Sequence, residues 1–498
     1  MIALPACSPV GPDFVKPEPE APAQWTGELD AGLRATPAEL GNWWASLQDP
    51  VLNALVEEAL KHNNSLQIAG LRILEARAQL GIAIGSQYPQ SQAASGQATW
   101  ISPPDNTGVT STYWQYSLGA AASWEIDFWG RFQRAIESAD AAFLASVASY
   151  RQAEVVLVNA VVDTYAVVRT TEEKLRIAHD NVRIQQRSFE IAEVLFRNGQ
   201  DSELDMQQAR TLLLATEATI PSLEASLAQV RNALSTLLGE PTGGVEPRLS
   251  AGSGIPQLPD QLPIGLPADL LRNRPDVREA ELLAMAQNAR VGLAEADLYP
   301  SFSLSGAIGL SAGAPGNSDF GDLFDTDALS VTLGPSFVWP FLNYGRIRNN
   351  VRVQDARLQQ ALVAYRETVL QAAREAEDAM AAYIGARRQA EILAKTVESA
   401  QRSNALSTLR YQEGFSDYQR VLDAQQALFT QQQRLADTQG AGIRNLVGLY
   451  KSLGAGWQAS GDRPFVDPET LETMQQRTNW GALINAAYPD RADAPTGE

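Results

Sequence analysis

Long helical patterns dominate the chain, and two blocks of strand-like alternation interrupt them. Apolar residues recur every three to four positions in 50–62, and an alanine- and leucine-rich segment, 64–86, continues the helical pattern. Residues 131–197 contain neither proline nor glycine. At 1.5 Å per residue they predict a helix of about 100 Å, which must lie in a bundle or coiled coil. Residues 202–239 predict its helical partner, and the proline- and glycine-rich stretch 241–266 predicts a linker.

The same order of elements recurs in the second half of the chain. Residues 274–298, 346–412 and 417–450 predict helices that match those of the first half. Four pairs of features share an offset of 215 residues (345 − 130): Gly130-Arg131 with Gly345-Arg346, Tyr150 with Tyr365, Gly199 with Gly414, and Ala209 with Ala424. Chance does not keep one offset over about 80 residues, so the sequence predicts an internal duplication.

Two strand-like segments lie between the helices of each half, at about 90–101, 112–128, 301–311 and 329–341. In the second segment, Trp114, Leu118 and Trp124 alternate with polar residues such as Gln115 and Ser117. Period-two alternation over ten or more residues, with aromatic residues near the ends, is typical of a transmembrane β-barrel. A soluble sheet with one wet face is the alternative. The unusual length of the strands, and the lack of further strand patterns for a second layer, favour the barrel.

Four strands are too few to close a barrel, because the open edges would expose unpaired backbone groups to lipid. Single-chain barrels begin at eight strands. Closure therefore requires several copies of the chain, and three copies would supply 12 strands whereas two would supply eight.

Composition removes several classes of function. The 39 basic residues against 58 acidic ones give a net charge of −19, which argues against nucleic-acid binding. Two histidines and one cysteine leave almost no material for a zinc site or a Cys-His nucleophile pair. No nucleotide loop appears, so we expect no enzyme, no cofactor and no metal. No run of 18 apolar residues exists, so we expect no membrane-spanning helix.

The only cysteine, Cys7, ends the segment Leu4-Pro5-Ala6-Cys7, which resembles a bacterial lipobox. We expect Cys7 to carry a lipid such as palmitate. The six residues before it are too few for a signal peptide, so a truncated or misassigned start is expected. A stray thiol is the alternative. Five prolines in 8–26 fit an extended tether.

Several motifs together resemble the TolC-type outer membrane factors, in the lipoprotein (NodT/OprM-like) branch of tripartite efflux systems. They run over nearly the whole chain: Cys-Ser-Pro-Val-Gly-Pro-Asp-Phe at 7–14, Trp43-Trp44 with Asp49-Pro50, Asn63-Asn64-Ser65-Leu66, Tyr88-Pro89, Trp-Glu-Ile-Asp-Phe-Trp-Gly-Arg at 124–131, Arg-Asn-Arg-Pro-Asp-Val at 272–277, and Val-Leu-Asp-Ala-Gln-Gln at 421–426. The resemblance implies a mixed α and β membrane protein. It would be a homotrimer with one 12-stranded outer-membrane β-barrel, continued by a long periplasmic α-helical barrel.

The resemblance also implies the function. Such a protein is a passive exit duct for small molecules or drugs in the outer membrane of a Gram-negative bacterium. Its partners are a periplasmic adaptor protein and an inner-membrane pump, usually of the proton-driven RND type. Two alternatives stay open: the exit duct of a type I protein-secretion system, which commonly lacks the lipobox, and a periplasmic coiled-coil scaffold.

We expect five regions along the chain. They are a lipidated tether at 1–26, a first repeat at 27–240, a linker at 241–266, a second repeat at 267–453, and a C-terminal equatorial segment at 454–498. At Gly130 and Gly345 strand twist must convert to helix twist, and glycine relieves the backbone there.

Each long helix is expected to end in a tight helix-turn-helix, with glycine at the helix end and Ser or Asp at the next N-cap. The resemblance makes these hairpin tips the adaptor-docking surface, although a plain αα-hairpin without a partner is the alternative. The candidate docking residues are Arg197, Asn198, Gly199, Asp201 and Ser202 in the first tip, and Glu413, Gly414, Phe415 and Ser416 in the second.

Two acidic residues, Asp205 and Asp423, lie just inside the tips. The resemblance implies that Asp423 helps to close the periplasmic mouth of the tunnel, where three copies would form a cation-binding ring. Gln426 stands where relatives often have arginine, and Gln419 where some have leucine, so other contacts can hold the closed state. A solvated helix face is the alternative for Asp423.

Overall fold

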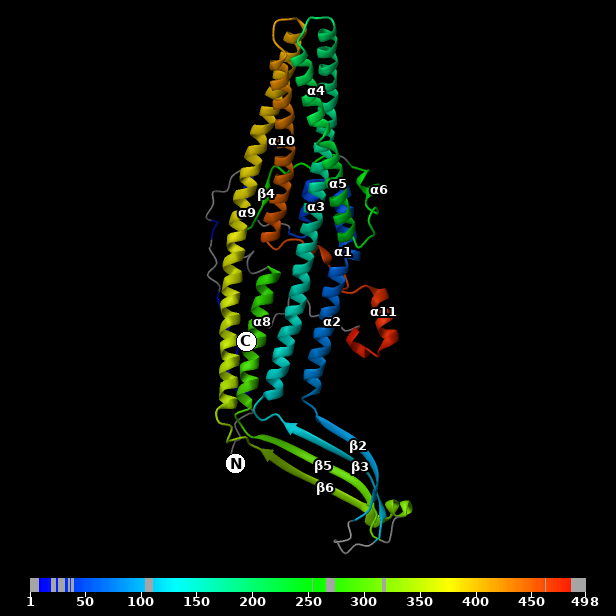
Figure 1. Cartoon of the computed structure of the whole chain (residues 1–498). Coiled ribbons are helices and arrows are strands. Elements are labelled where there is room, and N and C mark those ends of the chain that lie inside the picture. The colour runs from blue at the N-terminus through cyan, green and yellow to red at the C-terminus, as the bar shows by residue number, and fades with distance from the viewer. Residues whose placement is uncertain are drawn as a thin grey trace.

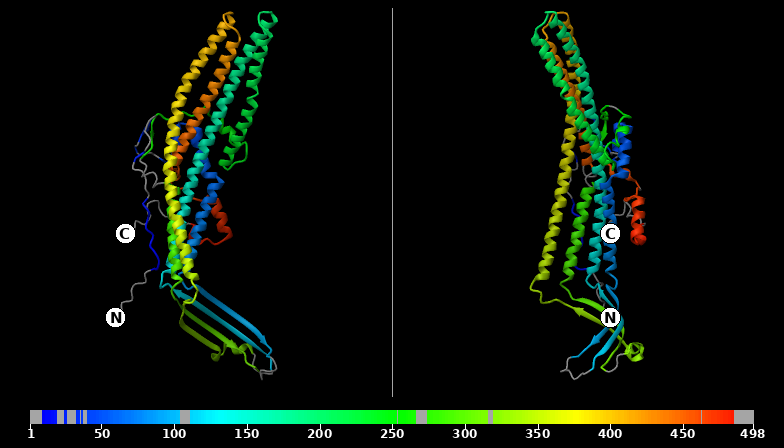
Figure 2. Two further views of the ribbon diagram at one scale, coloured as in Figure 1. Left: turned by 60° about the vertical axis from the view of Figure 1, so that its left-hand side comes forward. Right: turned by 45° about the vertical axis from the view of Figure 1, so that its right-hand side comes forward.

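The computed structural model describes residues 9–18, 24–25, 32–34, 36, 40–103, 111–252, 254–265, 274–315, 319–461 and 463–484. Cys7 lies outside these residues. The described chain is elongated, with a sheet at one end and two helical hairpin tips at the other (Figure 1). Figure 2 shows the same long shape from two further directions.

The first half contains helices α1 (Pro50–His62), α2 (Asn64–Gly85), α3 (Arg131–Arg197), α4 (Glu203–Glu217) and α5 (Ile220–Leu237). The second half contains α8 (Pro275–Ala296), α9 (Arg346–Gln412) and α10 (Gln419–Ser452). The two longest helices, α3 and α9, each have 67 residues. Shorter elements complete the fold: β1 (Leu33–Arg34), η1 (Trp43–Leu47), α6 (Glu246–Leu249), β4 (Leu262–Pro263), η3 (Phe320–Phe324), η4 (Thr326–Ala328), η5 (Trp457–Ser460), α11 (Pro468–Arg477) and η6 (Gly481–Ile484).

The expectation of one helix over 202–239 is wrong. The structure divides this segment into α4 and α5, and the helix is interrupted at Ala218 and Thr219. Pro221 is the physical cause, because its nitrogen carries no hydrogen to donate to a carbonyl in the preceding turn. Proline fits well in the first turn of a new helix, which is where α5 places it.

The sheet consists of β2 (Ser91–Ile101), β3 (Tyr113–Ile126), β5 (Ser301–Ala312) and β6 (Leu329–Val338), paired antiparallel in the order β2-β3-β5-β6. The pairing of β3 with β5 joins the two halves of the chain. The last strand ends three residues before the expected 341, because Pro340 cannot donate a ladder hydrogen bond.

The register gives the sheet two chemically different faces. Leu118 of β3 lies opposite Leu310 of β5, which lies opposite Leu329 of β6. Residues in register share a face, so this apolar row is followed by others along the strands. The opposite face carries small polar rows such as Ser117 with Ser311 and, one step along, Gly119 with Gly309 and Ser330.

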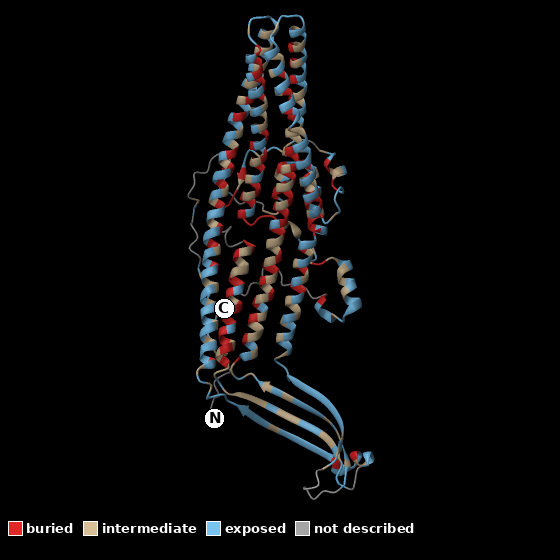
Figure 3. Ribbon diagram, viewed as in Figure 1, coloured by how far each residue is buried: buried red, intermediate tan, exposed pale blue. Residues whose placement is uncertain are grey.

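The main hydrophobic core lies in the middle of the helical shaft and not at the sheet (Figure 3). Trp43 is buried there and stacks on Tyr450 with ring centroids 4.6 Å apart. Asp49 begins α1 by accepting hydrogen bonds from the backbone amides of Val51 and Leu52, at 2.9 and 3.2 Å. Its second oxygen accepts a 2.5 Å hydrogen bond from Tyr165 of α3, which ties α1 to the long helix.

An extended N-terminal strap, residues 9–18, runs along α3 and α8. The Val10 amide donates to the Trp129 carbonyl at 3.0 Å, and the Arg134 guanidinium donates to the Val10 carbonyl at 3.1 Å. Gly11 crosses Gly292 of α8 so closely that a Cβ atom on Gly11 would lie 2.4 Å from the Gly292 Cα. The strap therefore begins at the end of α3 that adjoins the sheet.

Among the described residues, only α3 is long and apolar enough to meet the length and composition criteria for a membrane span. Of its most apolar window, 56% is buried inside the protein. A buried core helix of a soluble protein passes the same test, so this feature is weak evidence for a spanning helix.

Candidate functional site

The four-stranded sheet is the first candidate functional surface, because most of its apolar face is exposed. The short helix η3 reaches one end of this face, where the Phe320 ring contacts Tyr116 with centroids 5.2 Å apart. Leu333, Val331 and Phe337 of β6 are 77, 67 and 67% exposed. Aromatic residues stand near both strand ends, with Trp100 and Trp114 at one end and Trp124 at the other. An exposed apolar surface of this kind marks contact with a membrane or with another protein.

Both outer edges of the sheet are also open in the described chain. Strand β2 pairs only with β3, and β6 pairs only with β5. An edge strand presents unpaired N–H and C=O groups that can pair with another chain. The sheet therefore has an apolar face, a small polar face and two free edges.

The junction between β3 and α3 is built by the residues that follow the strand. Asp127 accepts a 3.0 Å hydrogen bond from the Gln133 amide and so caps α3, since the formal N-cap residue is Gly130. Trp129 donates to the Pro300 carbonyl at 2.9 Å and stacks on Tyr299. The Trp-Glu-x-Asp-x-Trp-Gly-Arg motif thus fixes the strand-to-helix turn.

Both expected transition glycines stand directly before a 67-residue helix in the left-handed region. Gly130 has a φ of +73° and Gly345 a φ of +83°. Tyr344, just before Gly345, is also left-handed, at +50°, and is almost fully exposed. Glycine reaches this region without strain, whereas tyrosine does not.

The two hairpin tips lie side by side at the end of the molecule opposite the sheet (Figures 1 and 2). In the first tip Arg197 ends α3, Asn198 and left-handed Gly199 form the turn, and Ser202 caps α4 by accepting from the Asp205 amide. In the second tip, Gly414 is left-handed and Phe415 is 72% exposed. The remaining candidates of the second tip, Glu413 and Ser416, flank these two residues.

One hydrogen bond joins the two tips. The Tyr411 hydroxyl, at the end of α9, donates to the Asp201 carboxylate in the first tip. Below it, Tyr418 is 2% exposed and packs against the Tyr411 ring with centroids 5.1 Å apart. Tyr418 belongs to a small tip cluster whose buried members are Ala192, Ala209, Tyr418, Val421 and Leu422. A hydrogen bond and an apolar cluster therefore hold the hairpins together at the tip.

The carboxylates at this contact are coupled. Burial opposes ionisation of Asp201, but hydrogen bonds from Tyr411, Asp205 and the Ser202 amide outweigh it and lower the pKa of Asp201. Burial and the adjacent Asp201 carboxylate raise the pKa of Asp205. Burial and the same carboxylate raise the pKa of Tyr411, so its hydroxyl keeps its proton and remains a donor.

The four candidate gate residues fall into two separate groups. The Gln419 amide donates to the Asp423 carboxylate at 2.9 Å, and Gln426 follows on the exposed surface of α10. Asp205 instead accepts a 2.7 Å hydrogen bond from Ser202 on α4. Within the described ranges, no hydrogen bond joins the Asp205 group to the Asp423 group.

Sequence reasoning missed Tyr411 and Tyr418. Tyr411 lies at the shared offset of 215 from Phe196 (411 − 196), so the two halves of the chain differ there by a tyrosine hydroxyl. That difference is the signal that could have singled it out, because a hydroxyl at a buried contact needs a partner.

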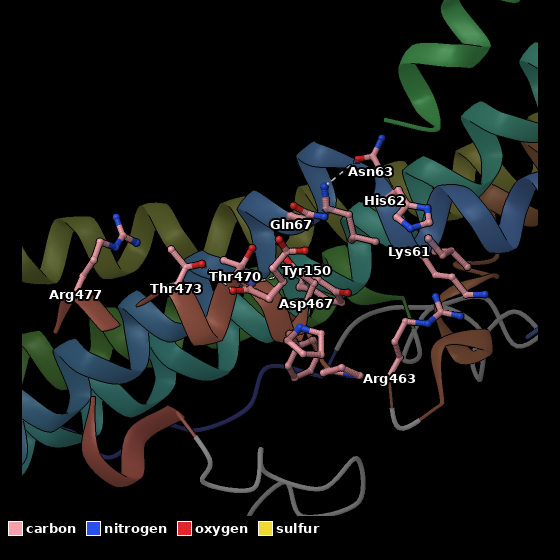
Figure 4. Close-up of a pocket in the computed structure, with 16 residues that line it drawn as sticks. Lys61, His62, Asn63, Gln67, Tyr150, Arg463, Asp467, Thr470, Thr473 and Arg477 are labelled. Carbon is pink, nitrogen blue, oxygen red and sulfur yellow. Dashed lines mark hydrogen bonds between the residues drawn. The ribbon is translucent and has the colours of Figure 1, made fainter. Parts of the chain in front are cut away.

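A cleft of about 810 Å³ lies at mid-shaft, where α1 meets α2 and residues 463–477 pass (Figure 4). Three of its polar groups have evident structural roles. Asp467 caps α11 by accepting from the Thr470 amide, while Lys61 and His62 stand in the last turn of α1, where cations complement the helix dipole. Among the residues that the structure describes, no group of three or more His, Cys, Asp or Glu side chains could hold a metal ion.

Comparisons with known proteins agree with this architecture. A family model described as "Outer membrane efflux protein" matches residues 55–240 and 266–455. The cation efflux system protein CusC of Escherichia coli K12 is 31% identical over 91% of this chain and 97% of its own. The solvent efflux pump outer membrane protein SrpC of Pseudomonas putida is 32% identical over 92% of this chain and 97% of its own.

The solved structure of the outer-membrane channel OprN superposes with a TM-score of 0.82 at 32% identity. The superposition covers 90% of this chain and 99% of that one.

Proposed function

Because this chain belongs to the outer membrane efflux protein family, it is an outer-membrane exit duct, and we propose that three copies of it form one passive pore for small molecules. The pore would be a 12-stranded β-barrel, continued into the periplasm by a tunnel of the long helices. Each copy would supply two strand pairs, β2-β3 and β5-β6, and two helical hairpins.

One observation carries this proposal, namely the sheet with two unlike faces and two free edges. An open sheet in lipid would leave the edge groups of β2 and β6 unsatisfied, and closure removes both edges. Pairing β6 of one copy with β2 of the next closes the ring. The apolar face then meets lipid, and the Ser/Gly/Thr face lines water.

Electron microscopy of the detergent-purified particle tests the proposal. We expect threefold symmetry, with about 100 Å of helical tunnel from the 67-residue helices and a barrel of roughly 30–40 Å beyond it. A monomeric particle, or one with an open sheet, would contradict the proposed pore.

We expect the hairpin tips to be the docking surface for a periplasmic adaptor, and an inner-membrane RND pump to supply the cargo. Two exposed apolar side chains support this, Leu204 beside the first tip and Phe415 in the second. Exposed apolar residues rimmed by polar ones are typical of protein-interaction sites. Gly199 and Gly414 have open space around them, so neither turn is covered within the described chain.

The mouth of the tunnel would be held closed by two devices. The first is the contact between Tyr411 and Asp201, which fixes one hairpin against the other. The second is a ring of Asp423 from three copies, with Gln419 bound to each carboxylate and Gln426 nearby. Such a ring binds cations and repels anions. Asp205 acts on the first device through Asp201.

A lipid on Cys7 would anchor the chain beside the barrel. The strap supports this, because its first described residue, Pro9, lies against Gly130 at the sheet end of α3. Cys7 precedes Pro9 by two residues, which span at most about 7 Å. An acyl chain there lies within reach of the periplasmic leaflet.

A further inference from the structure

The contact between α3 and α10 changes from apolar to polar toward the tips. On α3 the buried stripe reads Ala178, Asn181, Gln185, Ser188 and Ala192. The spacing of three and four residues is that of a coiled-coil seam, whose inward positions are normally apolar. Here three consecutive inward positions are polar.

Two partner positions on α10, Gln425 and Gln432, are also polar, and the buried apolar Leu428 lies between them. The Gln425 amide donates to the Ser188 hydroxyl at 2.6 Å, and the Asn181 amide donates to the Gln432 side-chain oxygen at 2.8 Å. We call Asn181, Gln185, Ser188, Gln425 and Gln432 the polar seam.

The polar seam is not fully satisfied. Gln185 is 1% exposed, and neither its side-chain oxygen nor its nitrogen has a hydrogen-bond partner in the described structure. Gln425 is equally buried, and its side-chain oxygen is also without a partner there. A buried amide without partners favours any state in which water reaches it.

Tight contacts bound the polar seam on both sides. Toward the sheet, the Lys174 ammonium group pairs with the Asp437 carboxylate at 2.9 Å. The Lys174 backbone carbonyl accepts a hydrogen bond from the Gln433 side-chain amide at 3.1 Å. Beyond these residues begins the apolar mid-shaft core, with Tyr165 and Val447. Toward the tip lies the tip cluster around Tyr418. The polar seam thus separates two apolar contacts that do not join into one core.

We propose that Gln185 and Gln425 are positioning residues that set how readily the tunnel mouth opens. When the tip contact is released, α10 separates from α3 from the tip back to about Gln432, where the contacts of Lys174 stop it. Water that enters the polar seam solvates both amides and offsets the exposure of the tip cluster. This inference rests on the proposed duct function.

The test compares trimers reconstituted in planar bilayers in a Tyr411→Phe background, which lacks the hydroxyl bound to Asp201 and in which we therefore expect the mouth to open more often. Gln185→Met replaces the unpaired amide by an apolar side chain of similar length. We expect the open probability to fall about tenfold, since the hydration gained on opening is lost. Gln425→Met should act in the same direction and serves if Gln185→Met fails to assemble.

Gln186→Met is the matched control. Its side chain is exposed and donates to Glu190, outside the polar seam, so the open probability should stay at the background value. Hydrogen–deuterium exchange gives a second readout: exchange of residues 421–432 should slow in Gln185→Met and not in the control.

The outcomes separate the two hypotheses. If the Tyr411→Phe pore conducts but neither seam variant lowers its opening or its exchange, the inference is wrong and the duct stands. Raised thermal stability with unchanged opening would also overturn it, because it would make Gln185 a structural residue only. If even the background variant forms no pore, the proposed function itself fails, and the inference with it.

Discussion

At the scale of single residues, one hydroxyl distinguishes the two hairpins. Phe196 and Tyr411 are separated by the offset of 215 residues that relates the two halves, and only Tyr411 has a hydroxyl that can donate a hydrogen bond to Asp201. A hydrogen bond to a charged group is worth about 1.5–3 kcal/mol. In the proposed trimer, three contacts of this size would be enough to hold the mouth closed and still small enough for a partner to release.

Tyr411→Phe should therefore raise the resting conductance of the pore in a planar bilayer. Loss of about 1.5 kcal/mol shifts an equilibrium roughly tenfold, so the opening equilibrium should shift roughly tenfold for each copy whose contact must break. Tyr418→Phe is the control, because the Tyr418 hydroxyl makes no hydrogen bond within the described residues, and its conductance should match wild type. Equal conductance of Tyr411→Phe and wild type would place the closing contact elsewhere.

The Asp201–Asp205 pair predicts a pH dependence of the tip contact. The raised pKa of Asp205 means that its proton stabilises the tip, and this stabilisation is lost as pH rises through that pKa. The lowered pKa of Asp201 means that its contribution is lost only as pH falls through that pKa. Closure is then strongest between the two values and weakens as pH rises above the higher one.

Asp205→Asn removes the second carboxylate, so the resting conductance should no longer increase as pH rises. A conductance series from acid to neutral pH checks this. An unchanged pH profile in the variant would mean that other groups titrate at the mouth.

The sequence could indicate the tip residues and Asp423, because turn glycines and N-cap residues mark the ends of hairpins in the local sequence. It could not indicate the contact between Tyr411 and Asp201. The two residues are 210 positions apart in the chain. They meet only because the two hairpins pack side by side with their tips at the same end of the molecule. Local pattern has no information on such packing.

At the scale of elements, the two strand-to-helix junctions are alike in backbone and unlike in surroundings. A Cβ atom on Gly130 would lie 2.3 Å from the Pro9 Cβ of the strap, whereas on Gly345 the nearest atom would be 3.8 Å away. The left-handed backbone disfavours alanine at both positions. At Gly130 the side chain would also clash with the strap.

Gly345→Ala should therefore lower the stability by about 1–2 kcal/mol, which is the backbone penalty alone. Gly130→Ala should lower it by clearly more, because Pro9 must also move. Thermal unfolding of the two purified variants, followed by circular dichroism, gives the comparison. Equal losses of stability in the two variants would mean that the strap can move away from residue 130 at no cost in free energy.

The long helices and four strands follow from periodicity, which is why 131–197 and 346–412 match α3 and α9 to the residue. The break between α4 and α5 does not follow from periodicity, because the apolar stripe continues through it. The single proline Pro221 causes the break, and its position in the sequence could have indicated it.

At the scale of the whole molecule, the proposed barrel and the lipid expected on Cys7 predict two independent sources of membrane association. Cys7→Ala should abolish acylation, as mass spectrometry would reveal, and leave barrel insertion largely intact. The apolar sheet face supplies the reason, since its burial in lipid does not depend on the strap. Complete release of the variant from outer-membrane fractions would contradict the barrel.

The equal length of α3 and α9 has a consequence for how this chain can change over generations. Inserting one residue into a helix rotates everything beyond it by about 100° and shifts it by 1.5 Å. In α9 such an insertion would turn Tyr411 away from Asp201 and shift it along the helix axis relative to the first tip. Indels in the shafts are therefore expected to be rare or to arrive in matched pairs. The loops at the far end of the sheet carry no such constraint, and there the two halves already differ in length.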